Sequence, residues 1–255
     1  MVIIVEGNIG SGKSLEALGN QYPGLIYTQT EPIEKWTSGE NILAKLYEEP
    51  RKYAFMFQVG CLVESNLYDD WTSGLFTFQE RSILSSYYIF STIHYHRENI
   101  NDNEFEILTK LFNKALPESK ITGIIYYRLP YEKALERIHN RGRPEETSIT
   151  ASYLNTLEKF HDELFINKAI AFNVPVMTID AEGDSKLILE TIKTFAKLTY
   201  QGPVIEEPNL CLCNRTWNIK EPLSTIERQL LEAKHSSIIQ SLKYTDHTQS
   251  SLQGN

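Results

Sequence analysis

The sequence contains little cysteine. Three cysteines, Cys61, Cys211 and Cys213, occur among 255 residues, and such an odd, sparse number suits a reducing compartment. Cys211 and Cys213 are close enough in sequence to share a metal ion, but no second pair and no nearby histidine completes a site. We therefore expect incidental thiols.

Long apolar runs and an excess of positive charge are also missing. No stretch approaches the roughly 20 apolar residues that a membrane-spanning helix needs, so we expect no membrane partner. The net charge of −8 argues against a protein that binds nucleic acid polymers, whereas a nucleotide needs only local positive charge. Because a strand-like run begins at Val2, we expect no cleavable targeting peptide and a cytoplasmic location, with the nucleus as the alternative.

The pattern of apolar residues predicts an α/β protein. Five runs are typical of strands: Val2–Val5, Leu25–Gln29, Leu75–Gln79, Gly123–Leu129 and Val174–Ile179. Helical patterns separate them: Ser14–Leu18, Ile42–Tyr68, Ser82–Asn99, Asn103–Leu116, Tyr131–Asn140, Ala151–Phe172 and Ser185–Ala196. This alternation predicts a parallel sheet with helices on both faces, and ligands that bind beyond the carboxyl ends of the strands.

The composition changes after about residue 200. Residues 201–217 hold two prolines and two cysteines with little periodicity, residues 222–244 resemble one helix, and the last eleven are polar. We expect a main domain over residues 1–198 and a C-terminal extension over 199–255, partly helical and partly disordered.

A phosphate-binding loop follows the first strand. Residues 7–14 match the pattern G-x-x-x-x-G-K-[ST] in full; they are Gly7, Asn8, Ile9, Gly10, Ser11, Gly12, Lys13 and Ser14. Glycines let backbone N–H groups approach an anion, and the start of the next helix adds partial positive charge. The pattern places Lys13 on the β- and γ-phosphates and Ser14 on Mg2+. The sequence therefore predicts a site for ATP and Mg2+.

Further motifs follow the loop in a fixed order. They are Thr30–Trp36 (TEPIEKW), Phe57–Gln58, Glu80–Ser82 with Phe90 after it, and Glu136–Glu146 (ERIHNRGRPEE). Together they make residues 1 to about 198 resemble the deoxynucleoside kinase family, which includes mitochondrial-type thymidine kinase, deoxycytidine kinase and the broad-specificity insect enzyme. The resemblance implies a P-loop kinase fold with a five-stranded parallel sheet, an ATP-dependent deoxynucleoside 5′-kinase of nucleotide salvage, and a homodimer.

The resemblance also assigns the catalytic residues. Glu31 would accept the proton of the nucleoside 5′-hydroxyl, as a carboxylate within hydrogen-bond reach can do. Arg81 would lie by the 5′-hydroxyl and offset charge on the transferred phosphoryl group. Glu80 would help to organise Mg2+, largely through water. Lys13 completes this catalytic set.

Substrate-binding residues come from the same resemblance. Gln58 would pair with the base edge, because its amide offers both a donor and an acceptor. Trp36 and Phe90 would pack on the base, although aromatic residues at helical spacing are more often plain core. Tyr47 and Glu146 match the residues that hold the sugar 3′-hydroxyl.

Three arginines, Arg137, Arg141 and Arg143, lie in a short basic segment after a helical pattern. They would close over the nucleotide phosphates as a lid, because the planar guanidinium binds phosphate oxygens in pairs. His139 stands where the family lid usually carries another arginine, which weakens the lid charge.

Two departures follow the Glu-Arg-Ser motif. Tyr87 replaces an arginine that supports neighbouring groups in the family. Ser86 stands where cytidine- and purine-preferring members carry aspartate and thymidine-preferring members carry alanine. A small, uncharged serine favours thymidine and deoxycytidine as substrates. Cys61 and Ser65 match pocket positions that are bulkier in the insect enzyme, so a wider pocket could also admit purines.

Two other functions fit part of the pattern. A nucleoside monophosphate kinase, such as a thymidylate kinase, shares the fold and the loop but needs extra positive charge for the acceptor phosphate. A nucleotide-binding regulatory or scaffolding protein would bind ATP without turnover; the intact Lys13, Ser14, Glu31, Glu80 and Arg81 argue against it.

Overall fold

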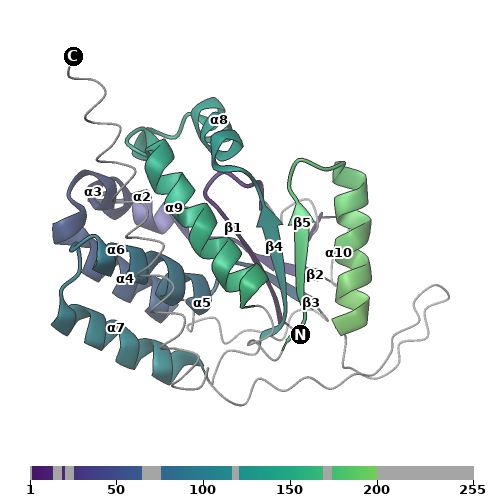
Figure 1. Ribbon diagram of the computed structural model, residues 1–255, viewed down its shortest axis with the longest axis horizontal. Coiled ribbons are helices and arrows are strands. Elements are labelled where there is room, and N and C mark those ends of the chain that lie inside the picture. Colours follow the sequence, from purple (N-terminus) through teal and green to yellow (C-terminus); the bar gives the residue numbers. More distant parts are fainter. Residues whose placement is uncertain are drawn as a thin grey trace.

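The sheet forms the centre of the molecule (Figure 1). The computed structural model describes residues 2–13, 19–20, 26–64, 76–116, 121–168 and 174–199. Its strands are β1 (Val2–Gly7), β2 (Ile26–Gln29), β3 (Phe76–Glu80), β4 (Ile121–Arg128) and β5 (Val176–Asp180). They follow the order β2-β3-β1-β4-β5, and all four pairings are parallel. The predicted α/β fold with a five-stranded parallel sheet is confirmed.

Helices cover both faces of the sheet. They are α2 (Ile33–Thr37), α3 (Ile42–Glu48), α4 (Pro50–Glu64), α5 (Ile83–Ser85), the π-helical segment η1 (Ser86–Ser91), α6 (Thr92–His96), α7 (Asp102–Ala115), α8 (Tyr131–Arg141), the 3-10 turn η3 (Pro144–Glu146), α9 (Ala151–Asp162), the π-helical segment η4 (Glu163–Asn167) and α10 (Ser185–Thr199). In Figure 1, α4, α6, α7 and α9 lie on one side of the sheet and α10 on the other.

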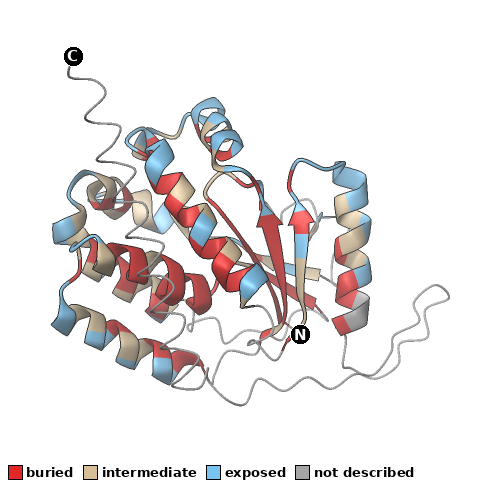
Figure 2. Cartoon of the chain, viewed as in Figure 1, coloured by how far each residue is buried: buried red, intermediate tan, exposed pale blue. Residues whose placement is uncertain are grey.

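The central strands account for the apolar runs of the sequence. Ile3, Ile4 and Val5 of β1, and Ile124 and Ile125 of β4, have no exposed surface. Strands of a parallel sheet are covered on both faces, so they read as continuous rather than alternating apolar runs. Figure 2 shows β1 and β4 buried along almost their whole length. The phosphate loop therefore leaves the middle of the sheet from its most deeply buried strand.

The single helix predicted for Ile42–Tyr68 is wrong. The structure breaks it at Glu49, whose φ of −128° and ψ of 64° are not helical. Pro50 begins α4, and a proline both lacks an N–H donor and disfavours helical backbone in the residue before it. The sequence analysis predicts no helix at α2. This short helix turns the chain after Glu31. Residues 65–68 lie outside the described residues.

Two predicted helices contain π-helical turns. Within Ser82–Asn99, η1 makes the wider turn between α5 and α6, and the predicted helix Ala151–Phe172 changes to η4 after Asp162. In η1 the hydroxyl of Ser91 donates to the carbonyl of Ser86 at 2.7 Å, across five residues. Residues 14–18, residues 169–172 and the predicted extension after residue 199 lie outside the described residues. Within the described residues, no helix is long and apolar enough to cross a bilayer.

Candidate active site

A cavity of about 680 Å3 opens at the carboxyl edge of the sheet. It is lined by the phosphate loop, by the residues that follow β2 and β3, and by α3, α4, η1 and η3. Fifteen of the residues predicted for the site line it: Ile9, Gly10, Gly12, Lys13, Glu31, Trp36, Tyr47, Gln58, Glu80, Arg81, Ser86, Phe90, Arg141, Arg143 and Glu146. Gly7, Asn8, Ser11 and Arg137 are not among its lining residues, and Ser14 lies outside the described residues.

Glycines give the loop its conformation. Gly10 and Gly12 have φ values of 79° and 85°, in the left-handed region that other residues rarely adopt. A Cβ on Gly10 would lie 2.7 Å from the carbonyl oxygen of Ala134 in α8. Asn8 ties the loop to α9, because its Nδ2 donates to the Leu154 carbonyl at 2.9 Å. The loop is therefore packed closely between α8 and α9.

Lys13 lies folded back over the loop. Its Nζ donates to the Asn8 carbonyl at 2.8 Å and to Ser11 Oγ at 3.3 Å, and only 5% of the residue is exposed. Burial, aided by the nearby Arg81 guanidinium, lowers the pKa of Lys13 to about 8. A phosphate in the cavity would offset this penalty by supplying negative charge.

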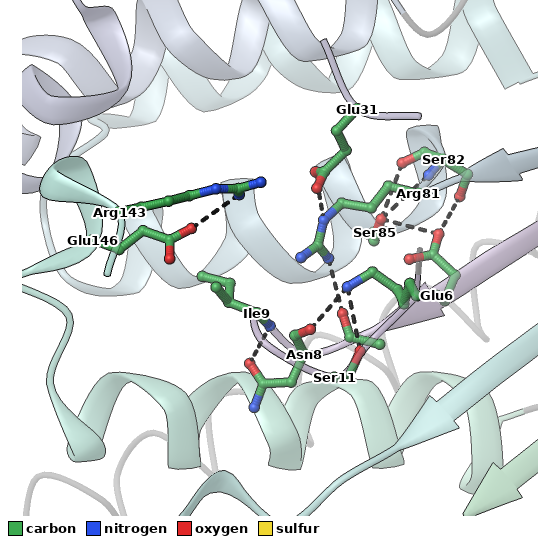
Figure 3. Close-up of polar contacts among 12 residues, drawn as sticks. Glu6, Asn8, Ile9, Ser11, Glu31, Arg81, Ser82, Ser85, Arg143 and Glu146 are labelled. Carbon is green, nitrogen blue, oxygen red and sulfur yellow. Dashed lines mark hydrogen bonds and ion pairs between the residues drawn. The ribbon is translucent and has the colours of Figure 1, made fainter. Parts of the chain in front are cut away.

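Glu31 and Arg81 form an ion pair across the site. They follow the neighbouring strands β2 and β3, and Arg81 Nε lies 2.6 Å from Glu31 Oε1. Arg81 also donates from Nη1 to the Gly7 carbonyl at 3.1 Å and lies over the Phe90 ring, 4.7 Å from its centroid. Figure 3 shows Arg81 between Glu31 and the start of the loop. The guanidinium is thus fixed from three directions.

The backbone of Arg81 adopts a conformation that costs energy. Its φ is 63°, and the left-handed region costs a residue with a Cβ about 1–2 kcal/mol. Two contacts hold the turn. The Arg81 N–H donates to the Val5 carbonyl at 2.9 Å, and Ser82 caps α5 by accepting the Leu84 N–H at 3.1 Å. The strain directs the side chain of Arg81 into the cavity.

Glu80 shares the acidic side of the cavity with Glu31. Burial raises the pKa of Glu80, and the Glu31 carboxylate raises it further while Lys13 opposes the shift. A divalent cation prefers carboxylate oxygens and would offset the repulsion between the two acids. Within the described residues, no cluster of three histidine, cysteine or acidic side chains could hold a metal ion by itself. Glu80 and Glu31 could each supply a carboxylate ligand to a cation bound in the cavity.

One part of the cavity, which we call the slot, is lined by Trp36, Phe57, Phe90 and the buried amide of Gln58. Gln58 is 2% exposed, and its Oε1 accepts no hydrogen bond from the described residues. Trp36 packs edge-on against Phe57 with 5.0 Å between ring centroids. A buried acceptor without a partner is costly, so a ligand with a donor at this place would satisfy Gln58.

Glu64 is a cavity residue that sequence reasoning missed. It lines the cavity at the end of α4, and its Oε2 accepts a hydrogen bond from Trp36 Nε1 at 3.2 Å. Nothing in the sequence distinguishes this glutamate from a solvated one at the end of a helix. The contact orients the indole of Trp36 at the rim of the slot.

The three arginines predicted for the lid form hydrogen bonds with other residues of the protein. Arg141 Nη2 lies 2.8 and 2.7 Å from the two carboxylate oxygens of Glu146, and Arg143 Nη1 lies 3.4 Å from Oε1 (Figure 3 shows the second pair). Arg137 instead donates to the carbonyls of Ser11 at 3.1 Å and Ala181 at 2.9 Å. Arg141 and Arg143 therefore line the cavity, while Arg137 ties α8 to the outside of the loop.

Comparisons with known proteins agree with this geometry. A family model described as deoxynucleoside kinase matches residues 3–199. The chain belongs to the deoxynucleoside kinase family. A probable deoxycytidine kinase of fowlpox virus is 34% identical over 192 residues, covering 71% of this chain and 79% of the viral protein. Human deoxycytidine kinase is 29% identical (76% and 90% covered), as is mitochondrial deoxyguanosine kinase of Xenopus laevis (71% and 81%).

The structure gives a physical reason for one departure from the family pattern. Tyr87 of this nucleoside kinase is 3% exposed and stacks on Phe112 and Phe105, with centroid distances of 4.4 and 5.6 Å. Its hydroxyl lies 2.9 Å from Thr109 Oγ1. The aromatic side chain belongs to the core under α7 and is not among the residues that line the cavity. His139 is exposed on α8.

Glu6 is a second residue that sequence reasoning missed. This carboxylate of β1 has no exposed surface, and its Oε1 accepts hydrogen bonds from Ser82 Oγ at 2.7 Å and Ser85 Oγ at 3.0 Å. Burial raises the pKa of Glu6 to about 7, although Arg81, the two serines and Lys13 oppose the shift. An acid within an apolar strand is the only signal in the sequence.

The raised pKa of Glu6 predicts how stability depends on pH. The folded protein keeps this proton up to about pH 7, whereas an exposed carboxyl has an ordinary pKa of 4.5 and loses it near that pH. The contribution of Glu6 to the free energy of unfolding therefore falls as pH rises from about 4.5 to 7. The Tm of Glu6→Gln should therefore rise relative to the Tm of the parent protein as the pH increases over this range. A constant difference from pH 4.5 to 8 would contradict the shift.

Proposed function

We propose that this kinase transfers the γ-phosphoryl group of ATP to the 5′-hydroxyl of a deoxynucleoside. The observation that carries the proposal is the arrangement of Glu31, Arg81 and Lys13 in one cavity. The Glu31–Arg81 pair, with 2.6 Å between its atoms, faces the phosphate loop that holds Lys13. A carboxylate base, an arginine and a phosphate-binding lysine are the groups that phosphoryl transfer to a hydroxyl needs.

Each of these residues has a role in the transfer. Glu31 accepts the proton of the 5′-hydroxyl as the oxygen attacks the γ-phosphorus, the bond from that phosphorus to the β,γ-bridging oxygen breaks, and ADP leaves. Arg81, fixed by Gly7 and Glu31, stabilises the charge on the transferring group, and Lys13 binds the β- and γ-phosphates. Arg141 and Arg143 turn from Glu146 to the phosphates when nucleotide is present. Most of the rate enhancement comes from positioning and electrostatics.

Mg2+ fits the acidic side of the site. Glu80, with Ser14 after the loop, would hold the ion together with phosphate oxygens, and Mg2+ when bound would neutralise charge on those oxygens. The raised pKa of Glu80, caused first by burial and then by Glu31, supports a cation at this place.

The slot beside Gln58 binds the base. The amide donates to and accepts from the base edge, Trp36 and Phe90 pack on its faces, and Tyr47 and Glu146 hold the sugar 3′-hydroxyl. Ser86 is small and uncharged, and it lies in the cavity beside this slot. The protein is proposed to prefer pyrimidines, thymidine and deoxycytidine, with room for purines; two relatives named deoxycytidine kinase support this.

Acceptor specificity tests the proposal. Phosphoryl transfer from ATP is measured with thymidine, deoxycytidine, deoxyadenosine, deoxyguanosine and thymidylate, with Mg2+ and with excess chelator. We expect kcat/KM for the two pyrimidine nucleosides to exceed that for the purines by at least about tenfold, because one pocket contact discriminates by roughly 1–3 kcal/mol. Turnover of thymidylate alone would make the protein a monophosphate kinase. ATP binding without turnover of any acceptor would favour a nucleotide-binding scaffold.

A homodimer is proposed from one exposed face. Met56 and Val63 on α4 are 54% and 43% exposed, and Ile107 on the neighbouring α7 is 46% exposed. Gly60 lies between the first two on the same side of α4, where a Cβ would meet no atom within 4 Å. This apolar, flat stripe suits a second copy of the chain.

The stripe predicts the effect of one substitution. In sedimentation equilibrium the parent protein should run at about twice its mass of 29.4 kDa. Met56→Arg should run as a monomer, because it places a charge in the apolar interface. The exposed Leu187 on α10 gives the control, since Leu187→Arg should stay dimeric. A parent protein that sediments as a monomer would exclude this dimer.

A further inference from the structure

We propose that Glu6 is a positioning residue for phosphoryl transfer: its buried carboxylate holds Ser82 and Ser85, and through them the turn that presents Arg81. This inference rests on the proposed role of Arg81 in the transfer. Glu6 itself is not among the residues that line the cavity, so it acts through the residues that it holds.

Three consecutive residues of β1 hold this turn. The Val5 carbonyl accepts the Arg81 N–H at 2.9 Å, and the Gly7 carbonyl accepts Arg81 Nη1 at 3.1 Å. Between them, the Glu6 side chain accepts Ser82 Oγ at 2.7 Å (Figure 3). Two of the three contacts use backbone carbonyls, which every residue has. The contact of Glu6 is the one that depends on its side chain.

The hydroxyl of Ser82 makes two hydrogen bonds in opposite directions. It donates its proton to Glu6 and accepts the N–H of Leu84, which caps the start of α5. Ser85, one turn further along, donates to the same Glu6 oxygen at 3.0 Å. Two hydroxyl donors converge on one oxygen, and a carboxylate is the strongest acceptor that a side chain offers. The acid therefore fixes both ends of the first turn of α5.

Burial of the Glu6 carboxyl group costs free energy, because one of its oxygens loses contact with water and gains no hydrogen bond in return. Its second oxygen, Oε2, accepts no hydrogen bond from the described residues, and the residue has no exposed surface. The cations that act on it are Arg81, which precedes Ser82 in the chain, and Lys13 on the loop. An apolar residue would pack at this place without that cost but could not hold Ser82.

Loss of the contact releases the strain stored at Arg81. Neighbouring residues hold its φ at 63°, and without the hydrogen bond from Ser82 to Glu6 the turn can relax toward the ordinary helical or extended region. The guanidinium would then shift relative to Glu31 and the phosphates. A displacement of about 1 Å at a reacting centre costs up to roughly 100-fold in rate. ATP binding, which the loop and Lys13 supply, does not depend on this turn.

Four variants of the full chain test the inference. Glu6→Met fills much the same space but has no oxygen to accept the Ser82 and Ser85 hydroxyls, and Ser85→Ala removes one of the two donors while the acid remains. Glu163→Met makes the same change at another buried acid, which is 4% exposed, does not line the cavity, and accepts Asn167 Nδ2 at 2.7 Å. Arg81→Lys is the reference for the site itself. Each is measured for kcat, nucleoside KM, ATP affinity and Tm.

The expected result separates kcat from binding. Glu6→Met lowers kcat at least about tenfold, with nucleoside KM and ATP affinity within about threefold, and Ser85→Ala lowers kcat in the same way by less. Glu163→Met changes kcat less than about twofold. If Glu6→Met does not fold, Ser85→Ala decides alone.

Three results would overturn the inference: an unchanged kcat in the folded variants, a rise in KM with kcat unchanged, or an equal loss in Glu163→Met. If Arg81→Lys keeps full activity, the proposed function of the site fails instead. If Arg81→Lys is inactive while Glu6→Met is normal, only the inference about Glu6 fails.

Discussion

Glu31→Gln should lower kcat for nucleoside phosphorylation by about 10²–10⁴, the range that a positioned general base supplies. Glutamine has the same shape and can still accept the hydrogen bond of Arg81 Nε, which lies 2.6 Å from Glu31 Oε1. It cannot take a proton from the 5′-hydroxyl. Steady-state kinetics with a saturating pyrimidine nucleoside would give kcat, and a fluorescent ATP analogue would report nucleotide binding.

Glu31 is identified as the base by a loss in kcat that leaves ATP affinity unchanged, and the size of the loss in kcat is less informative. ATP affinity should stay within about threefold, because Glu31 holds no phosphate, and most of the loss should be in kcat. Glu48, an exposed residue of α3, gives the matched control, and Glu48→Gln should retain full activity. A Glu31→Gln variant with at least half the parent kcat would exclude Glu31 as the base.

Lys13→Met should nearly abolish turnover while it makes the free protein more stable. Removal of one preorganised cation from a phosphoryl-transfer site costs roughly 10²–10³ in kcat. Methionine fills much the same volume as the lysine stem but carries no charge. Because only 5% of Lys13 is exposed, the substitution removes a buried ammonium group from the loop. Lys13→Met should therefore show both a loss of ATP turnover and a higher Tm than the parent protein.

The pKa of Lys13 gives the sign of the stability change. It falls from 10.5 in the unfolded chain to about 8 in the folded protein, first through burial and then through Arg81. The folded state thus binds fewer protons between pH 8 and 10.5, and stability rises with pH in that window. Below pH 8 the full penalty is present, on the order of 3 kcal/mol.

At pH 7, therefore, Lys13→Met should unfold at a higher temperature than the parent, and the difference should shrink as the pH approaches 10.5. Lys110→Met, at an exposed residue of α7, should change neither activity nor this pH dependence. A Lys13→Met variant that is less stable than the parent at pH 7 would show that the Nζ contacts with Asn8 and Ser11 outweigh the cost of burial.

Patterns of local sequence predicted the fold well. Continuous apolar runs mark β1 and β4 because a parallel sheet is covered on both faces, and the glycine positions of the loop follow from left-handed backbone. The break at Glu49 also has a signal in the sequence, since Pro50 lies inside the predicted helix, but apolar periodicity continues on both sides of it. The π-helical turn η1 has no comparable signal, because its residues fit an α-helix equally well.

The contacts inside the site were less predictable for a different reason. Which cation pairs with which acid depends on how several elements meet, and motif spacing does not contain that information. The sequence placed Arg137, Arg141 and Arg143 together in a lid, yet Arg137 bonds to backbone carbonyls and the other two to Glu146. Glu6 and Glu64 were missed because their partners, Ser82, Ser85 and Trp36, lie far away along the chain.

The π-helical turn at residues 86–91 has a consequence for comparing this chain with its relatives. A π-helical turn holds one residue more than an α-helical turn, so in genetic terms it is a one-residue insertion absorbed inside a continuous helix. Deletion of one residue here would wind the segment back into an α-helix and leave the residues on either side facing as they do now. An alignment with a relative that lacks the extra residue therefore needs a one-residue gap inside residues 86–91. Ungapped alignment through this segment would thus equate residues that face different ways.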